Sequence, residues 1–425
     1  MKRLPVILYL LLLVSHTGTA YTQTRFVHTR GREIVDAGGQ PLLLKGTNLG
    51  NWLVPEGYMF RLKNTNSPRM IHETIAQLIG PEAATAFWNT YLQNYITAAD
   101  IHYLKSIGAN SVRIPFNYRL FTNEDYLGKN DAERGFRLLD KVIGWCKQEQ
   151  LYVILDMHCA PGGQTGDNID DSWGYPFLFE SESCRQLTIE IWKKIAGRYR
   201  NEEIVIGYDL LNEPIAHYFD TKALNPLLEP FYKELIREVR SVDQYHIMFL
   251  GGAQWDTNFK IFGEPFDSNV VYTFHKYGDK PDLGSIQRFI DFRDKYNVPV
   301  YAGETGENTD EWITAFRKVL EDHNIGWHFW PYKKMESPKN ILCVKVPAAY
   351  DSLVQYAESP RTSFKEIRKL APANRTLIRQ ALDEVLNNCL FEQCMPNDGY
   401  IKALGFTPKR TQDASLTGAL TPTGS

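Results

Sequence analysis

The sequence predicts a single (β/α)8 barrel, an α/β fold in which eight parallel strands alternate with helices. Three observations support this prediction: eight short apolar runs recur along the chain, stretches of helical period separate most of them, and the runs lack strict polar–apolar alternation. Parallel strands that are covered on both faces have this composition. The alternative is an open doubly wound sheet, but residues 46–52, after the first run, lack the glycine-rich phosphate-binding pattern.

The predicted barrel strands are short and rich in β-branched or aliphatic residues. They are Leu42–Lys45, Ser111–Ile114, Tyr152–Asp156, Val205–Leu210, Ile247–Leu250, Val270–Phe274, Val298–Ala302 and Gly326–Trp330. Pro299 is compatible with the seventh strand because it stands near the strand's start. The predicted helices between them include Glu133–Gln150, Glu182–Tyr199, Leu227–Val242, Ser285–Tyr296 and Asp310–Asp322.

Several segments exceed a minimal barrel. A hairpin formed by Phe26–Val35 and Leu42–Lys45, with its turn at Asp36–Gly39, is predicted to cover the barrel bottom. A mostly helical excursion, residues 52 to about 110, separates strands 1 and 2. The barrel domain is expected to span residues 21–371. A C-terminal helical extension at 372–410 and a disordered tail at 411–425 are expected to follow.

The N-terminus has the layout of a secretory signal peptide over residues 1–20. Lys2 and Arg3 precede an apolar run, Leu4–Val14, and the small residues Gly18 and Ala20 follow it. The run has eleven residues, whereas a spanning helix needs about 20, and no later apolar stretch is longer. We therefore expect a secreted or periplasmic protein without a membrane span. The alternative is a short buried helix.

Composition excludes some partners. With 47 basic and 50 acidic residues the net charge is −3, so the basic excess typical of nucleic-acid-binding proteins is missing. The six cysteines are compatible with free thiols or with one or two disulfides, and Cys389 and Cys394 are close enough in sequence to pair. Their spacing does not suit zinc. No metal or cofactor is predicted.

Two glutamates follow predicted strands that lie opposite each other across the barrel mouth. Glu213 comes after strand 4 and Glu304 after strand 7, at the face where such barrels carry their chemistry. Glycoside hydrolysis needs two carboxyls, one a proton donor and the other ionised. Glu304 is the better candidate for the ionised group, with Arg113 and Tyr277 as partners, and Glu213 is the better proton donor.

The motifs around these glutamates resemble glycoside hydrolase family 5 from about Gly31 to Lys369. They are Asn212-Glu213-Pro214, Gly303-Glu304-Thr-Gly306, Ser111-Val-Arg113-Ile-Pro115, Asp156-Met-His158 and His275-Lys-Tyr277. The resemblance implies a TIM barrel in which Glu213 is the acid/base and Glu304 the nucleophile of a retaining enzyme. It also implies substrate-binding roles for Arg113, His158, Asn212, His275, Tyr277 and Trp330.

Aromatic residues at the predicted site have two interpretations. Trp330 is expected to form the floor of the sugar subsite, whereas Trp327 lies three residues away on the same strand, faces the other side and packs. The loop aromatics are expected either to stack on sugar faces or to pack, and they are Trp52, Tyr58, Trp173 and Trp255.

Two segments, Gly46–Gly57 and His158–Asn168, resemble the exo-β-1,3-glucanase branch of that family. Cys159 departs from the branch, where a small glycine usually stands beside the histidine, and we expect it in the pocket wall. The acidic cluster of Asp167, Asp170 and Asp171 is compatible with Ca²⁺ binding, but its spacing favours a solvated turn.

The expected function is that of a secreted retaining β-glycosidase that hydrolyses a β-glucan or β-glucoside by double displacement. Its partner is then a β-linked oligo- or polysaccharide. An endo-β-1,4-glucanase or mannanase on the same scaffold is the alternative within this class. A barrel that binds carbohydrate without catalysis is the alternative from another class, and it should lack one of the two carboxylates. Linkage, exo or endo mode and oligomeric state are not fixed by the sequence.

Overall fold

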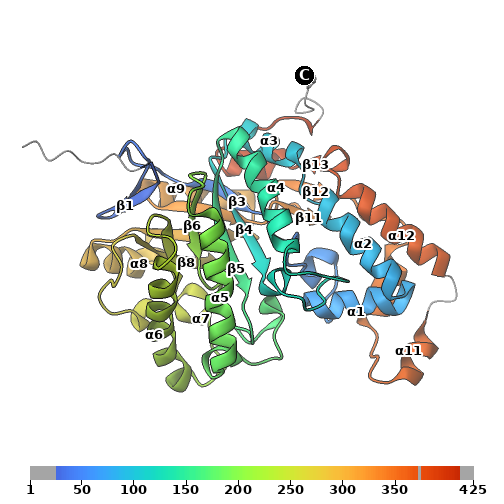
Figure 1. Cartoon of the computed structure of the whole chain (residues 1–425). Helices are drawn as coiled ribbons and strands as arrows, with labels where there is room; N and C mark the ends of the chain where they lie inside the picture. Colours follow the sequence, from blue (N-terminus) through green and yellow to red (C-terminus); the bar gives the residue numbers. More distant parts are fainter. Residues whose placement is uncertain (1–24, 372–374, 412–425) are drawn as a thin grey trace, which may run out of the picture.

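The computed structural model describes residues 25–371 and 375–411, and it confirms the barrel (Figure 1). Eight parallel strands close in the order β10-β3-β4-β5-β6-β7-β8-β9. Their bounds are β3 Lys45–Asn48, β4 Ser111–Asn117, β5 Tyr152–Cys159, β6 Val205–Asp209, β7 Ile247–Gly251, β8 Val270–Tyr277, β9 Val300–Gly306 and β10 Gly326–Trp330. The predicted signal peptide and, apart from residue 411, the predicted tail lie outside the described residues.

The helices that alternate with these strands are α3 Ala98–Ile107, α4 Arg134–Glu149, α5 Glu182–Tyr199, α6 Thr221–Arg240, α7 Ala253–Asp256, α8 Leu283–Tyr296 and α9 Asp310–Asp322. Helices α5 and α9 begin and end at the predicted residues. Helix α6 begins at Thr221 instead of Leu227, although Pro226 and Pro230 lie inside it. The Asp220 side chain accepts hydrogen bonds from two backbone N–H groups and caps this earlier start.

The prediction for the first barrel strand was wrong by three residues. The ladder begins at Lys45, and the more apolar segment before it crosses the bottom of the barrel. The Leu42 N–H donates to the carbonyl of Ile34 (2.8 Å), and the Asn110 side chain bonds to the Leu43 carbonyl. Apolarity misled the prediction because β3 itself, Lys-Gly-Thr-Asn, contains no large apolar residue.

The predicted turn at Asp36–Gly39 is present, since Val35 bridges Pro41 across it, and a second hairpin precedes it. Strands β1 (His28–Arg30) and β2 (Glu33–Val35) pair antiparallel around Gly31, and the Asp36–Gly39 turn leads onward to the barrel. Val27 and Ile34 belong to one buried cluster with inward-facing residues of the strands, namely Ile154, Ile206, Ile247, Phe249, Val271 and Tyr301. The hairpin therefore plugs the bottom of the barrel, and the opposite end stays available for a site.

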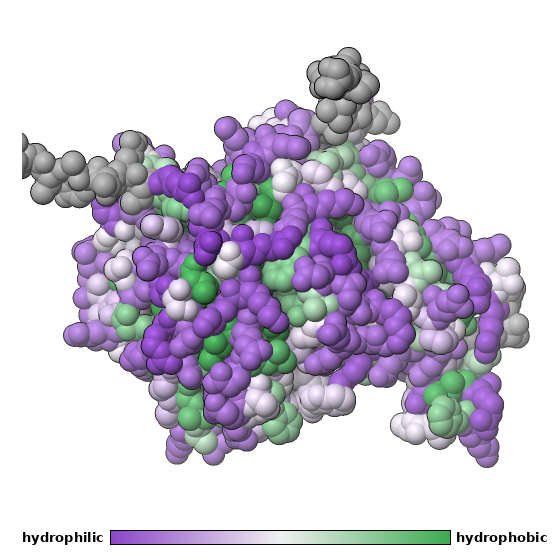
Figure 2. All heavy atoms as spheres, in the orientation of Figure 1, coloured by the Kyte–Doolittle hydropathy of each residue, from purple (hydrophilic) through white to green (hydrophobic). Residues whose placement is uncertain are grey.

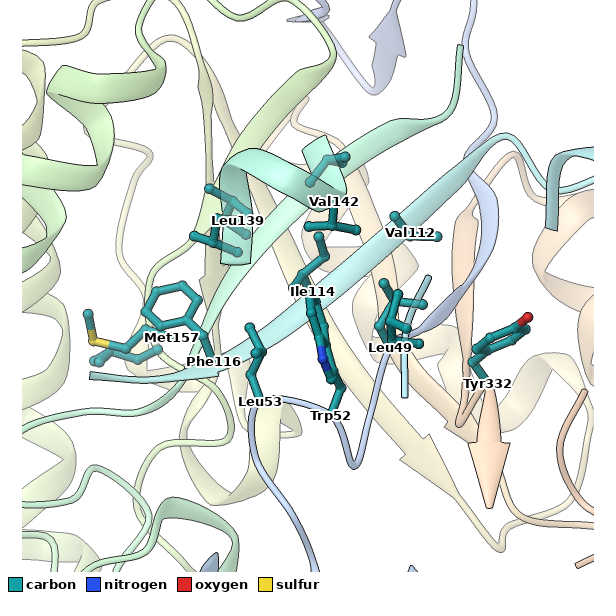
Figure 3. Close-up of a cluster of buried hydrophobic side chains, with 14 of the residues drawn as sticks. Leu49, Trp52, Leu53, Val112, Ile114, Phe116, Leu139, Val142, Met157 and Tyr332 are labelled. Atoms are coloured by element: carbon teal, nitrogen blue, oxygen red, sulfur yellow. The ribbon is translucent and has the colours of Figure 1, made fainter. Parts of the chain in front are cut away.

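The larger core lies between the strands and the helices (Figure 3). On β4, Val112 and Ile114 are fully buried beside Leu139 and Val142 of α4. Each such side chain contributes about 1.5–3 kcal/mol through burial. Because side chains alternate along a strand, Arg113 faces the barrel interior instead.

The excursion and the C-terminal segment pack against each other on one flank of the barrel (Figure 1). The helices here are α1 Pro68–Ile79, α2 Pro81–Asn94, α10 Tyr350–Glu358, α11 Phe364–Leu370, α12 Arg375–Asn388 and α13 Asp398–Ala403. A small sheet joins β11 Lys333–Met335, β12 Leu342–Val344 and β13 Met395–Pro396. Short 3-10 turns are η1 Gly57–Phe60, η2 Tyr118–Phe121, η3 Asn168–Asp170, η4 Phe177–Phe179, η5 Phe259–Ile261 and η6 Phe391–Gln393.

A buried ion pair ties these segments together. The Lys333 ammonium lies 2.5 Å from Asp100 and donates to the carbonyls of Tyr95 and Cys389. These partners come from the excursion and from the end of α12, so the extension is fastened next to the last barrel strand. Removal of one partner from such a buried pair costs about 3–5 kcal/mol.

Three further features concern membrane spans, the surface and the cysteines. In the part of the chain that the structure describes, no helix is both long and apolar enough to cross a membrane. Figure 2 shows a face covered mostly by hydrophilic residues, with hydrophobic ones scattered among them. All six cysteines are free thiols, including Cys389 and Cys394.

Candidate active site

A cavity of about 450 Å³ opens beside the carboxyl ends of the barrel strands. Six of the eight residues predicted for the site line it: His158, Glu213, His275, Tyr277, Glu304 and Trp330. Arg113 and Asn212 are fully buried beneath it, where the Arg113 guanidinium bonds both Asn212 (2.8 Å) and Glu304 (2.6 Å). The structure thus brings the eight residues together, while the roles assigned to them stay predictions.

Arg113 organises the interior of the barrel mouth. Its guanidinium has five partners on, or just beyond, four strands, which are Glu304 (2.6 Å), Asp209 (2.8 Å), Asn212 (2.8 Å), Asn48 (3.0 Å) and Asp156 (3.1 Å). A buried cation needs this full set of charged and polar acceptors to offset its desolvation. The arginine consequently fixes the position of Glu304 and anchors the strands at the same time.

Glu304 is surrounded by hydrogen-bond donors. One carboxylate oxygen accepts from Arg113, and the other accepts from the Tyr277 hydroxyl at 3.0 Å. Donors and a nearby cation stabilise the ionised form of a carboxyl group. This environment suits an anionic nucleophile.

Glu213 has the opposite environment. It follows β6 in a left-handed backbone conformation (φ 49°), and 14% of its side chain is exposed. Burial raises the pKa of Glu213 to about 7, although His158 and Arg113 act in the lowering direction. A carboxyl group with this pKa is still largely protonated in mildly acidic solution, so Glu213 can donate a proton.

The two glutamates are close together. One carboxylate oxygen of Glu213, one of Glu304 and one ring nitrogen of His275 lie within 4.8 Å of one another. Within residues 25–371 and 375–411, this is the one group of such side chains whose spacing also suits a metal ion. Its members already bond one another, Arg113 and Tyr277, and hydrolysis by two carboxyls requires no metal. We therefore assign the group to acid–base chemistry.

His275 connects Glu213 to a residue that the sequence analysis missed. Burial lowers the pKa of His275 to about 3, so the imidazole is neutral and carries one N–H. Its Nδ1 lies 2.8 Å from Glu213, and its Nε2 lies 3.3 Å from the buried carboxyl of Asp256. Burial raises the pKa of Asp256 well above its ordinary value. The Nε2 has no aligned hydrogen-bond partner among the described residues, whereas an Asp256 carboxyl oxygen accepts from the backbone N–H of Glu213 (3.3 Å).

Replacement of Asp256 tests this arrangement. We expect Asp256→Ala to lower kcat/KM by about 10- to 100-fold, because it removes the acceptor of the Glu213 backbone N–H. Asp256→Asn should keep most activity because its side-chain oxygen can still accept from that N–H. Steady-state kinetics with one aryl glycoside measures both variants. An Asn variant as impaired as the Ala variant would show that the acid group of Asp256, and not its acceptor oxygen, supports the activity.

His158 and Trp330 form one wall of the cavity. Their rings stack at 5.6 Å with an interplanar angle of 6°. The His158 Nδ1 bonds Asp156 (2.8 Å), and the Trp330 N–H donates to the Tyr58 hydroxyl (2.5 Å). Trp327 is fully buried and contacts Phe329 and Phe406, as expected of a packing residue.

The expectation for Cys159 was wrong. Its thiol is fully buried, donates to the Ile169 carbonyl (3.4 Å) and does not line the cavity. The alternation of side chains along β5 explains this, because adjacent residues point to opposite faces.

The four loop aromatics divide between the cavity, the core and the surface, whereas the acidic cluster differs from its prediction. Tyr58 and Trp255 line the cavity, Trp52 packs in the core, and Trp173 is 71% exposed under the Arg69 guanidinium. Asp170 and Asp171 do not form the favoured solvated turn. Both are buried, and they bond loop N–H groups and Arg119, whereas Asp167 lines the cavity.

Glu56 is a further cavity residue that the sequence analysis did not single out. Only 4% of it is exposed, and no hydrogen-bond partner among the described residues reaches its Oε1. Burial raises its pKa well above the ordinary value, with the nearby Glu304 adding to the effect. The signal available was its place in the loop after the first strand, where the Gly46–Gly57 resemblance ends.

Comparison with known proteins agrees with this geometry. A family model described as Cellulase (glycosyl hydrolase family 5) matches residues 71–336. A β-xylosidase of Phanerodontia chrysosporium is 31% identical, over 92% of this chain and 98% of its own. A glucan 1,3-β-glucosidase of Candida oleophila is 31% identical over 55% of this chain and 58% of its own.

A solved structure shares the fold. The crystal structure of a rutinosidase from Aspergillus niger has a TM-score of 0.56 and 19% identity, and the match covers 69% of this chain and 90% of that one. The barrel with its facing carboxyls defines a glycoside hydrolase. The family match and the relative that aligns over nearly its full length show which family of glycoside hydrolases this is. The chain belongs to glycosyl hydrolase family 5.

Proposed function

We propose that this glycoside hydrolase is an exported, retaining exo-β-glycosidase that removes terminal β-linked glucosyl or xylosyl units. The observation that carries the proposal is the spacing of the two glutamates, whose nearest oxygens lie within 4.8 Å. Retaining enzymes hold their carboxyls about 5–5.5 Å apart, whereas inverting enzymes leave about 6.5–9.5 Å for a water molecule. The pair therefore favours direct attack by one carboxylate.

The proposed reaction uses the two carboxyls in turn. Glu304 attacks the anomeric carbon while Glu213 gives its proton to the glycosidic oxygen, so the sugar is held as a glycosyl ester. Glu213, now ionised, takes a proton from a water molecule. The resulting hydroxide attacks the same carbon, breaks the ester and releases the sugar with its original configuration.

The cavity wall supports exo action. Tyr58, from the loop after β3, bonds Trp330 at the end of β10, and the Lys334 ammonium lies 4.3 Å from the centre of the Tyr58 ring. Lys334 in turn pairs with Glu307 (2.9 Å), which follows β9. These contacts join three loops on the Glu304 side of the cavity. We infer that a wall in this place ends the cavity behind one terminal sugar, and Glu56, which lines the cavity, is then available to its hydroxyls.

The sugar class rests on the relatives and on the segments after β3 and β5. The full-length relative is called a β-xylosidase and another a glucan 1,3-β-glucosidase, and glucosyl and xylosyl rings differ only by a hydroxymethyl group. An unpaired buried carboxyl such as Glu56 and a stacked aromatic wall suit either ring.

Product analysis tests the proposal. We expect single sugars from β-1,3-glucan, xylooligosaccharides or aryl β-glycosides, with the β-anomer formed first in ¹H NMR spectra. The α-anomer as first product would contradict retention, and a ladder of oligosaccharides would favour the endo alternative. Protein with Glu304→Ala, purified in parallel, controls for contaminating activity.

A further inference from the structure

A row of aromatic side chains leaves the cavity beside Glu213. It starts at Trp255, which lines the cavity, and continues through Tyr218, Phe219, Tyr175 and Phe177. Successive ring centres are 5.9, 4.8, 5.3 and 4.9 Å apart. We call these five residues the aromatic row. Tyr218 is 53% exposed and Phe177 43%, so the row carries large apolar faces into solvent.

The start of the row is held in a strained backbone. Gln254, Trp255 and Asp256 all have positive φ angles, between 52° and 57°, a conformation that persists only where its surroundings enforce it. The Gln254 N–H donates to the Ile215 carbonyl (3.0 Å), and the Gln254 side chain donates to Asn225 (2.8 Å). Such strain tends to occur at functional positions, and here it directs Trp255 into the cavity.

The middle of the row is fixed by hydrogen bonds to acidic groups. The Tyr218 hydroxyl donates to Asp167, a cavity residue, at 2.5 Å, and the Tyr175 hydroxyl donates to Glu180 at 2.7 Å. Fixed rings lose little side-chain entropy when a ligand covers them. Carboxylates beside the rings also give acceptors for ligand hydroxyls.

The direction of the row follows from the proposed chemistry. Glu213 must lie next to the glycosidic oxygen that it protonates, so the leaving group extends past Glu213 and away from the wall of Tyr58 and Trp330. The loop that carries Glu213 continues directly to Tyr218 and Phe219. The aromatic row therefore lies where the remainder of a chain-like substrate has to leave the cavity.

We propose that the aromatic row is an extended leaving-group site that binds successive sugar rings of a β-linked oligosaccharide. The inference rests on the proposed function. Pyranose rings have apolar C–H faces that stack on aromatic rings and hydroxyls that bond acceptors, and the row offers both kinds of partner. An aryl leaving group would use the rings near the cavity but would not reach Phe177.

Chain length is the variable that tests this site. We expect kcat/KM of the wild-type protein to rise from an aryl monoglycoside through disaccharides to tetra- and pentasaccharides. Phe177→Ala and Tyr218→Ala should each lower the ratio of kcat/KM for the pentasaccharide to that for the disaccharide by about 5- to 30-fold. Tyr218→Phe should keep a high ratio because it keeps the ring.

Tyr245→Ala is the matched control. Tyr245 is also 53% exposed but stacks on Phe26, far from the cavity at the bottom of the barrel, so this variant should show the wild-type ratio. Circular dichroism melts check that the variants fold, and Phe177→Leu replaces Phe177→Ala if the latter does not.

The outcomes separate the two proposals. A wild-type protein that releases no sugar from any substrate would overturn the proposed function. Hydrolysis without length dependence, or a ratio unchanged in both Ala variants, would overturn the leaving-group site alone. A Phe177 effect seen with long polyaryl glycosides but not with oligosaccharides would overturn the assignment of sugar rings as its occupants.

Discussion

Glu304→Ala is expected to lower kcat/KM by at least about 10⁴-fold, because it removes the group that we assign as nucleophile. Arg113 and Tyr277 both bond the Glu304 carboxylate, and the substitution leaves a small space between them. Azide should enter this space and attack the anomeric carbon in a single displacement. Activity should then return in part, and a β-glycoside should yield an α-glycosyl azide.

The measurement is turnover of an activated aryl glycoside with and without azide, with the product anomer assigned by NMR. Glu311→Ala is the matched control, since Glu311 is an exposed glutamate at the start of α9 just beyond the same strand. Normal turnover in Glu304→Ala would exclude Glu304 as nucleophile. A β-glycosyl azide from this variant would also contradict the assignment, because it would require the covalent intermediate to form without Glu304.

Glu213→Ala is expected to lower kcat/KM by about 10²- to 10⁴-fold for glycosides whose leaving groups need protonation. The loss should be much smaller for a dinitrophenyl glycoside, whose leaving group departs as the anion. Azide should rescue the second step and give a β-glycosyl azide, the opposite anomer from the Glu304 variant. Equal losses for good and poor leaving groups would contradict the role of Glu213 as proton donor.

The pH profile gives an independent check on Glu213. Because burial raises its pKa to about 7, the proton is present below that pH and is lost above it. We expect kcat/KM of the wild-type protein to fall as the pH rises through about 7, and this limb should be absent in Glu213→Gln. A limb that persists in the Gln variant would assign the titration to another group.

The two glutamates and most of the other residues that line the cavity as predicted could be selected from the sequence, because they follow or end runs with the composition of buried strands. Glu213 and Glu304 stand out as charged residues next to apolar segments, and His275 and Tyr277 close the strand between them. The number of strands and the order of these motifs were sufficient for the fold. Residue pattern and helix propensity predicted both ends of α5 correctly, since no proline lies within this helix.

Apart from Glu56 in the loop after β3, the residues that the sequence analysis missed lie inside strands or in a strained turn. Asn48 and Asp209 sit on strands and face Arg113, and which face of a strand looks inward depends on how the barrel closes. Asp256 reaches His275 only through three consecutive residues with positive φ, and no local pattern predicts such a turn. Gly251 is a sequence feature that reflects this turn, because a Cβ there would lie 1.9 Å from an Asp256 oxygen.

The attachment of the C-terminal segment has a consequence for how this enzyme can change. Trp330 accepts a hydrogen bond at its carbonyl from Tyr400 (3.4 Å), and Lys333, three residues later, bonds the carbonyl at the end of α12. The cavity wall is thus supported from a segment that the catalytic motifs do not include. Natural substitutions in α12 and α13 can therefore affect catalysis and are subject to selection on it. Transfer of the barrel alone into another enzyme would remove this support, so these helices have to be transferred with it.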